Sequence, residues 1–120
     1  MPLSEYQYII VRYVHGVAVV SFPEALAMFE GEKVQAVGHE LTDLVESRKE
    51  PRILLNLSNA HFISSAMLAH LVKLYRKIQE AKGRIKLCSL RPVILDAFKV
   101  SHFDRLFEIH PDEASALKKF

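Results

Sequence analysis

One nearly uninterrupted apolar run, residues 52–57, constrains the fold of this chain more than any other feature. A strand that is apolar on both faces belongs inside a sheet covered by other elements, as the strands of parallel sheets do. A short polar stretch follows, and apolar residues then recur at helical spacing through residues 65–82. The sequence therefore predicts a buried strand, a loop and a long amphipathic helix, a succession typical of an α/β domain.

The first 46 residues predict a hairpin followed by a helix. Residues 6–14 and 17–22 are rich in β-branched and aromatic side chains, and the His15-Gly16 pair between them suits a tight turn. Residues 24–32 predict a loop that leads into a helix, and apolar positions repeat at helical spacing through residues 34–46. The two strands of the hairpin are expected to pair antiparallel.

Alternation of strands and helices continues to the end of the chain. Gly83 suits a helix stop, residues 84–90 predict a further strand, and Pro92 suits the first turn of another helix. Residues 103–109 predict an apolar connector, which a last short helix follows. Strands separated by helices pair in parallel through right-handed crossovers. We therefore expect one α/β domain over residues 1–120, with a mixed sheet of four or five strands, an initial antiparallel hairpin and about four helices.

Charge and cysteine content restrict the surroundings in which such a chain works. The formal net charge of +2 is too small to indicate binding to nucleic acid or to a membrane surface. The single cysteine, Cys88, excludes an internal disulfide and suits a reducing compartment, and its apolar neighbours predict a small core residue. The first residues lack the blocks of a signal peptide, and no apolar run approaches the ~18 residues that span a bilayer. We expect a cytoplasmic domain that binds neither nucleic acid nor membrane.

Two consecutive serines, Ser64 and Ser65, stand where the long helix begins. Backbone N–H groups at a helix start lack partners, and the helix dipole adds partial positive charge there. Either hydroxyl can cap the helix, which stabilises it by about 1 kcal/mol. A phosphate on either serine would use the same donors and would turn a neutral surface anionic in one step. Spacing alone leaves capping and phosphorylation open.

Patterns of catalytic or metal-binding residues are missing from the sequence. None of the six histidines has metal-ligand spacing; His39-Glu40, for example, has no second histidine four residues after the first. A serine hydrolase would need glycines around its nucleophile, whereas Ile63 and Ala66 flank the serine pair. The four glycines are isolated, so they form no phosphate-binding loop. We therefore expect no enzyme activity, no metal ion and no cofactor.

Three motifs follow one another along the chain: Phe-Ile-Ser-Ser-Ala-Met-Leu at residues 62–68, Gly-Arg-Ile-Lys-Leu at 83–87 and Phe-Asp-Arg-Leu-Phe-Glu-Ile at 103–109. In kind and order they resemble the STAS domain of bacterial anti-sigma factor antagonists, over about residues 11–117. This resemblance implies the fold expected above. It also implies that Ser65 is the phosphorylated serine of the family, with Ser64 as the alternative.

The resemblance further implies a function and partners. A chain of this kind would bind an anti-sigma factor serine kinase, and a sigma factor would thereby be freed for transcription. Phosphorylation of Ser65 would end that binding, and a partner phosphatase would restore it; self-association is left open. The expected partner-binding residues are Asn59, His61, Ile63, Ser64, Ser65, Ala69, Lys73 and Arg76.

Three positions differ from the family pattern and favour a second interpretation. Ile63 stands where the family has aspartate, Ala66 stands where it has glycine, and Ala27 stands in place of an aspartate after the second strand. In this interpretation the chain is a degenerate STAS scaffold in a multiprotein signalling assembly, and its serines only cap the helix.

Overall fold

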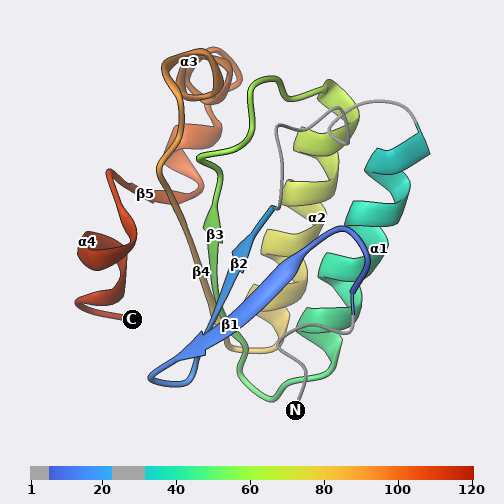
Figure 1. The fold of residues 1–120 in the computed structure, drawn as a ribbon, viewed down its shortest axis with the longest axis vertical. Helices are drawn as coiled ribbons and strands as arrows, with labels where there is room; N and C mark the ends of the chain where they lie inside the picture. The colour runs from blue at the N-terminus through green and yellow to red at the C-terminus, as the bar shows by residue number, and fades with distance from the viewer. Residues whose placement is uncertain (1–5, 23–31) are drawn as a thin grey trace.

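A five-stranded mixed sheet organises residues 6–22 and 32–120, the part of the chain that this computed structural model describes (Figure 1). The strands lie side by side in chain order: β1 (Ile10–Val14), β2 (Val17–Ser21), β3 (Arg52–Asn56), β4 (Arg84–Cys88) and β5 (Glu108–His110). β1 and β2 pair antiparallel, and the remaining pairs are parallel. The expected α/β class, the mixed sheet and the initial hairpin are thus confirmed.

Three crossover helices, α1 (Glu32–Glu46), α2 (Ser65–Glu80) and α3 (Pro92–Val100), connect the parallel strands. Since the strands follow chain order and such crossovers are right-handed, the three helices pack on one face of the sheet. Their buried residues form one continuous core with that face. The short helix α4 (Glu113–Leu117) lies on the opposite face (Figure 1). There Ala116 packs with a smaller cluster of four buried residues, namely Val17, Val19, Leu54 and Cys88.

The central strand β3 is buried on both faces, as its sequence predicts. Ile53 and Leu55 belong to the core under the crossover helices, whereas Leu54 belongs to the cluster under α4. All three side chains are fully buried. β3 therefore fixes the position of the loop that follows it and of the start of α2.

The first strand is shorter than its sequence predicts, because it begins at Ile10 rather than at residue 6. The backbone N–H groups of Gln7, Tyr8 and Ile9 donate instead to the carboxylate of Glu40 on α1, at 2.8, 2.8 and 3.1 Å. A carboxylate that accepts several backbone donors replaces the partner that a neighbouring strand would supply. Residues 7–9, directly before β1, are thus bound to α1.

The apolar connector expected at residues 103–109 contains regular structure of its own. A short 3-10 helix, η2 (Phe103–Arg105), precedes β5, whose residues Glu108, Ile109 and His110 pair in parallel with β4. This pairing supplies the fifth strand. The loop expected at residues 24–32 lies outside the described residues, apart from Glu32, which begins α1 two residues earlier than expected. Ala27 lies in the same undescribed stretch.

The end of α2 depends on Gly83 for space and not for its backbone angles. The left-handed position after the helix is taken by Lys82, with φ of 59°, and the N–H of Gly83 donates to the carbonyl of Ile78 at 2.8 Å. A Cβ atom at Gly83 would lie 2.1 Å from the carbonyl oxygen of Pro51. A glycine is therefore required where α2 turns back past the start of β3.

Candidate functional site

The two serines at the start of α2 have different roles in the structure. Ser64 is the N-cap: its Oγ accepts a hydrogen bond from the N–H of Met67 at 3.1 Å, and its carbonyl accepts one from Leu68 at 3.0 Å. Ser65 is the first residue of the helix and is exposed. The hydroxyl of Ser64 is therefore committed to the helix, while Ser65 presents its side chain at the surface.

The loop that leads to the serine pair is held by several hydrogen bonds. The N–H of Ser58 donates to Oδ1 of Asn56 at 2.9 Å, and its carbonyl accepts from Nε of Arg91 at 2.8 Å. Asn59 donates from Nδ2 to the carbonyl of Phe22 at 2.7 Å, which ties the loop to the end of β2. Ala60 is fully buried. The serine pair thus follows a fixed segment that spans the carboxyl ends of β2, β3 and β4.

The expected partner-binding residues divide into exposed and buried positions. His61, Ala69, Lys73 and Arg76 are exposed, and Asn59 is half-buried with its amide used inside the protein. Ile63 has to be corrected, because its side chain is 8% exposed and belongs to the main core. Its place in the sequence as a neighbour of the serines suggested contact, but the chain turns this side chain inward to anchor the start of α2.

Phe62 is an exposed residue that the individually expected partner-binding residues leave out, although it belongs to the loop over residues 59–63 in which three of them lie. Its ring is 51% exposed, between buried Ile63 and exposed His61. The available signal was an aromatic residue in a loop of small and polar side chains. Local sequence could not determine which of the adjacent Phe62 and Ile63 faces the core, since a loop has no fixed side-chain period.

The exposed face of α2 that begins at Ser65 carries positive charge further along. Ala69, Lys73 and Arg76 lie at intervals of three or four residues after Ser65, so they share one side of the helix. Lys77 forms a salt bridge of 2.7 Å with Glu46 on α1, which raises the pKa of Lys77. Lys73 and Arg76 make no salt bridge within the described residues.

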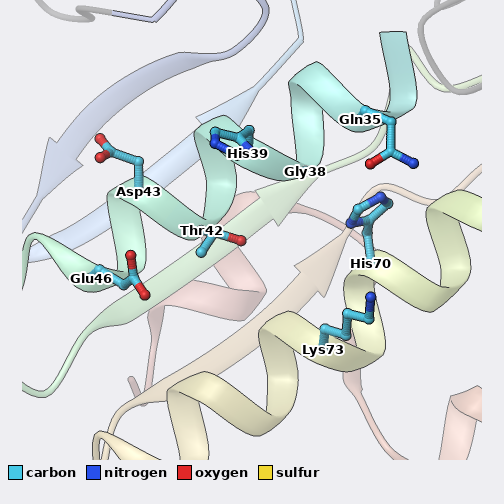
Figure 2. A pocket seen from close by; sticks show the side chains of 8 residues that line it. All are labelled: Gln35, Gly38, His39, Thr42, Asp43, Glu46, His70 and Lys73. Atoms are coloured by element: carbon cyan, nitrogen blue, oxygen red, sulfur yellow. The ribbon is translucent and has the colours of Figure 1, made fainter. Parts of the chain in front are cut away.

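An open cleft of about 330 Å³ lies between α1 and α2 beside this face (Figure 2). His70 and Lys73 line it from α2, and the imidazole of His70 points toward Gln35 and Gly38 of α1. Burial lowers the pKa of His70, and the charge of Lys73 lowers it further. The carboxylates of the cleft are already used: Asp43 accepts from the Tyr6 hydroxyl at 2.8 Å, and Glu46 binds Lys77. The cleft therefore offers mixed polar groups without an aligned set of ligands.

Two further observations concern the described residues only. Within residues 6–22 and 32–120, no three His, Cys, Asp or Glu side chains are grouped so that they could hold a metal ion. None of the helices in this part of the chain has the length and apolar character needed to cross a membrane.

The structure thus has a serine at the start of the helix that follows a buried strand, in a mixed sheet of five strands. In comparison with known protein families, the STAS domain family matches residues 8–116. The chain belongs to the STAS domain family. The family expected from the sequence motifs is thereby confirmed. Among relatives of this STAS domain, BtrV of Bordetella bronchiseptica, an anti-sigma factor antagonist by name, is 28% identical over 71 residues. The match covers 59% of this chain and 61% of BtrV.

Solved structures share the fold over nearly the whole chain. An anti-sigma-factor antagonist (STAS) domain protein from Planctomyces limnophilus superposes with a TM-score of 0.76 at 24% identity, covering 92% of this chain and 96% of that one. The phosphorylated form of the Bacillus cell fate determinant SpoIIAA superposes with a TM-score of 0.63 at 14% identity, covering 90% and 96%. At these sequence identities, the two superpositions show that the proteins share the fold.

Proposed function

We propose that this STAS domain is a non-enzymatic regulatory module of the anti-sigma factor antagonist type. It binds an anti-sigma factor serine kinase while Ser65 is unmodified, and phosphorylation of Ser65 by that kinase ends the binding until a phosphatase removes the phosphate. One observation carries the proposal: Ser65 is exposed at the first position of α2, while the hydroxyl of neighbouring Ser64 is used as the cap. BtrV, a relative named as an antagonist, and the phosphorylated form of SpoIIAA support it.

The start of α2 suits a phosphate physically. The N–H groups of Ser65 and Ala66 precede the first hydrogen bond of the helix ladder, and the helix dipole places partial positive charge beside them. A phosphoserine carries about −1.5 to −2 charges at neutral pH, so the surface around Ser65 would become strongly anionic. A partner seated on the neutral form would meet both the added bulk and the added charge.

Phosphosite mapping after incubation with ATP and the serine kinase of the same host tests the proposal. We expect modification at Ser65, none in Ser65→Ala, and loss of kinase binding in Ser65→Asp. Ser64→Ala is the matched control, because it should lose about 1 kcal/mol of stability through the missing cap but should still be phosphorylated at Ser65. An unmodified Ser65, together with unchanged binding of Ser65→Asp, would refute the switch.

A second function, a scaffold without a phosphorylation switch, is favoured by the residues around the serines. Ile63, with a buried apolar side chain, precedes the two serines where the family pattern has an aspartate. Ala66 follows the two serines where the pattern has a glycine. A scaffold would assemble stably with its partners independently of a kinase. The mass of the complex, measured by light scattering before and after incubation with kinase and ATP, distinguishes the two functions. A phosphorylation switch releases the partner and lowers the mass, whereas a scaffold keeps the mass unchanged.

A further inference from the structure

The loop before the serine pair presents one aromatic side chain on a fixed support. Leu57, Ala60 and Ile63 are buried beneath the loop, and the hydrogen bonds of Ser58 and Asn59 hold it to α3 and to β2. On this support the ring of Phe62 is half exposed. A single exposed apolar residue needs no explanation by itself. An aromatic ring whose backbone is already ordered, however, loses little entropy when a partner covers it, and such rings are enriched among the residues that dominate binding energy.

The other large exposed apolar side chains lie far from Ser65 in the sequence or are partly covered by another side chain. The ring of Tyr13 is covered on one side by the guanidinium of Arg48, 4.8 Å from the ring centre. Val93 and Val100 belong to α3 and have smaller side chains. Among the exposed large apolar residues of the described chain, Phe62 alone lies within three residues of Ser65. It is therefore the one whose contacts a phosphate on Ser65 would directly disturb.

The charge on α2 indicates the kind of partner. Lys73 follows Ser65 by eight residues and Arg76 by eleven, so they lie about 12 and 16 Å further along the same side of the helix. Glu46 offsets the neighbouring Lys77, which leaves Lys73 and Arg76 as the exposed cations of this side. A surface with an aromatic residue at one end and two cations at the other is complementary to an apolar pocket bordered by carboxylates.

We infer that Phe62 is the anchor of the docking surface and that Lys73 and Arg76 select a partner with an acidic face. This inference rests on the proposed function, because the partner is the kinase that modifies Ser65. Phe62 enters an apolar pocket of the kinase, and carboxylates of the kinase lie opposite the two cations. A phosphate on Ser65 then repels that acidic face from a position between the anchor and the cations, which explains why one modification would release the whole surface.

Titration of the purified kinase with variants of this chain tests the inference. A non-hydrolysable ATP analogue keeps Ser65 unmodified during the measurement. We expect Phe62→Ala to weaken binding at least about 30-fold, the level typical of an interface anchor. The double variant Lys73→Glu/Arg76→Glu should weaken it about 10-fold or more at low salt, and this difference should shrink as salt is added.

The controls are matched in chemistry but lie elsewhere. Val93→Ala removes an exposed apolar side chain from α3, and Lys99→Glu/Lys118→Glu makes the same charge change on α3 and after α4. Both should change the dissociation constant less than about 3-fold. Unchanged thermal unfolding of each variant shows that the fold is intact.

The outcomes separate this inference from the proposed function. If the kinase phosphorylates Ser65 but binds Phe62→Ala like the wild type, the anchor is refuted and the switch stands. If the double variant of Lys73 and Arg76 binds as well as its control, the acidic partner face is refuted. If the kinase neither binds nor modifies the wild-type chain, both the docking surface and the switch are wrong.

Discussion

At the scale of single residues, the imidazole of His70 on α2 lies close to the backbone of α1 at Gly38. A glycine inside a helix costs about 1 kcal/mol relative to alanine. Here the glycine is needed for space, because a Cβ atom at position 38 would lie 2.5 Å from Nδ1 of His70 and 2.9 Å from Cγ. The imidazole therefore rests against the backbone of α1 at the mouth of the cleft (Figure 2).

Substitution of Gly38 should have an effect that depends on His70. In a His70→Ala background, Gly38→Ala should stabilise the protein by about 1 kcal/mol, the gain in helix propensity. In the wild-type background the gain should vanish or reverse, since the ring has to leave its place. Urea denaturation of the four proteins in a double-mutant cycle measures the difference. Equal effects in both backgrounds would contradict the contact.

The same contact makes stability depend on pH. Burial and the charge of Lys73 place the pKa of His70 below its ordinary value, so the unfolded chain binds this proton more tightly than the folded one. The stabilising contribution of neutral His70 is therefore complete above about pH 6.5, the ordinary histidine value, and is lost as pH falls through the lowered folded-state pKa.

Denaturation at a series of pH values should show this loss. We expect the free energy of unfolding of the wild type to fall more steeply below about pH 6.5 than that of His70→Gln. His61→Gln, at an exposed loop position, is the matched control and should follow the wild type. The idea fails if His70→Gln and the wild type have the same pH profile.

At the scale of elements, α4 is attached to its face of the sheet by polar contacts in addition to the apolar cluster around Ala116. The buried ammonium of Lys86 on β4 donates to the carbonyls of Ala116 and Lys119 and lies 3.1 Å from the carboxylate of Glu108. Glu113 accepts from Arg12 on β1 and from Asn56 on β3 at 2.6 to 2.7 Å. Burial alone would raise the pKa of Glu113, but these two donors hold it below its usual range.

Removal of the buried ammonium should release α4 without unfolding the rest of the domain. Lys86→Met leaves the carbonyls at the end of α4 without their charged donor, and such hydrogen bonds contribute about 1.5–3 kcal/mol each. Amide hydrogen exchange should therefore become at least about tenfold faster in residues 113–120, while β3 and α2 keep their protection. Lys99→Met, at an exposed position of α3, is the control. Uniform acceleration over the whole chain would show that Lys86 supports the core instead.

Elements differ in how far their own sequence determines them. β3 is a nearly uninterrupted apolar run and α2 is a long helix with a clear apolar period, so their own residues predict both elements well. β5 has three residues and forms because the backbone of β4 is available beside it. The late start of β1 has a similar cause, because Glu40, more than thirty residues away, binds the N–H groups that would have extended the strand at its beginning.

At the scale of the whole molecule, one continuous core joins the sheet to α1, α2 and α3. A domain of 120 residues with such a core is expected to unfold in one cooperative transition. A phosphate on Ser65 would therefore act on a surface whose support stays the same. The switch proposed above is one of charge and shape at the surface rather than a rearrangement of the fold.

A stability measurement on Ser65→Asp tests this separation. A carboxylate at the first position of a helix is favourable by about 0.3–1 kcal/mol, so the variant should be as stable as the wild type or slightly more stable. Thermal unfolding followed by near- and far-ultraviolet circular dichroism should give coincident single transitions. Ser65→Ala is the neutral control. A marked loss of stability in Ser65→Asp would mean that any loss of kinase binding reflects a damaged fold.

The sequence by itself determined the α/β class, the central strand β3, the helix α2, the serine pair at its start and the family, because these depend on local period and motif. Tertiary structure decided which serine caps the helix, and it decided that Ile63 faces the core while Phe62 faces outward. It also decided that β5 forms, that β1 begins late and that His70 rests on Gly38. The cap is a bond to Met67, three residues after Ser64, and its geometry is set where the loop enters α2. The other features depend on partners distant in sequence, and only the folded chain brings such partners into contact.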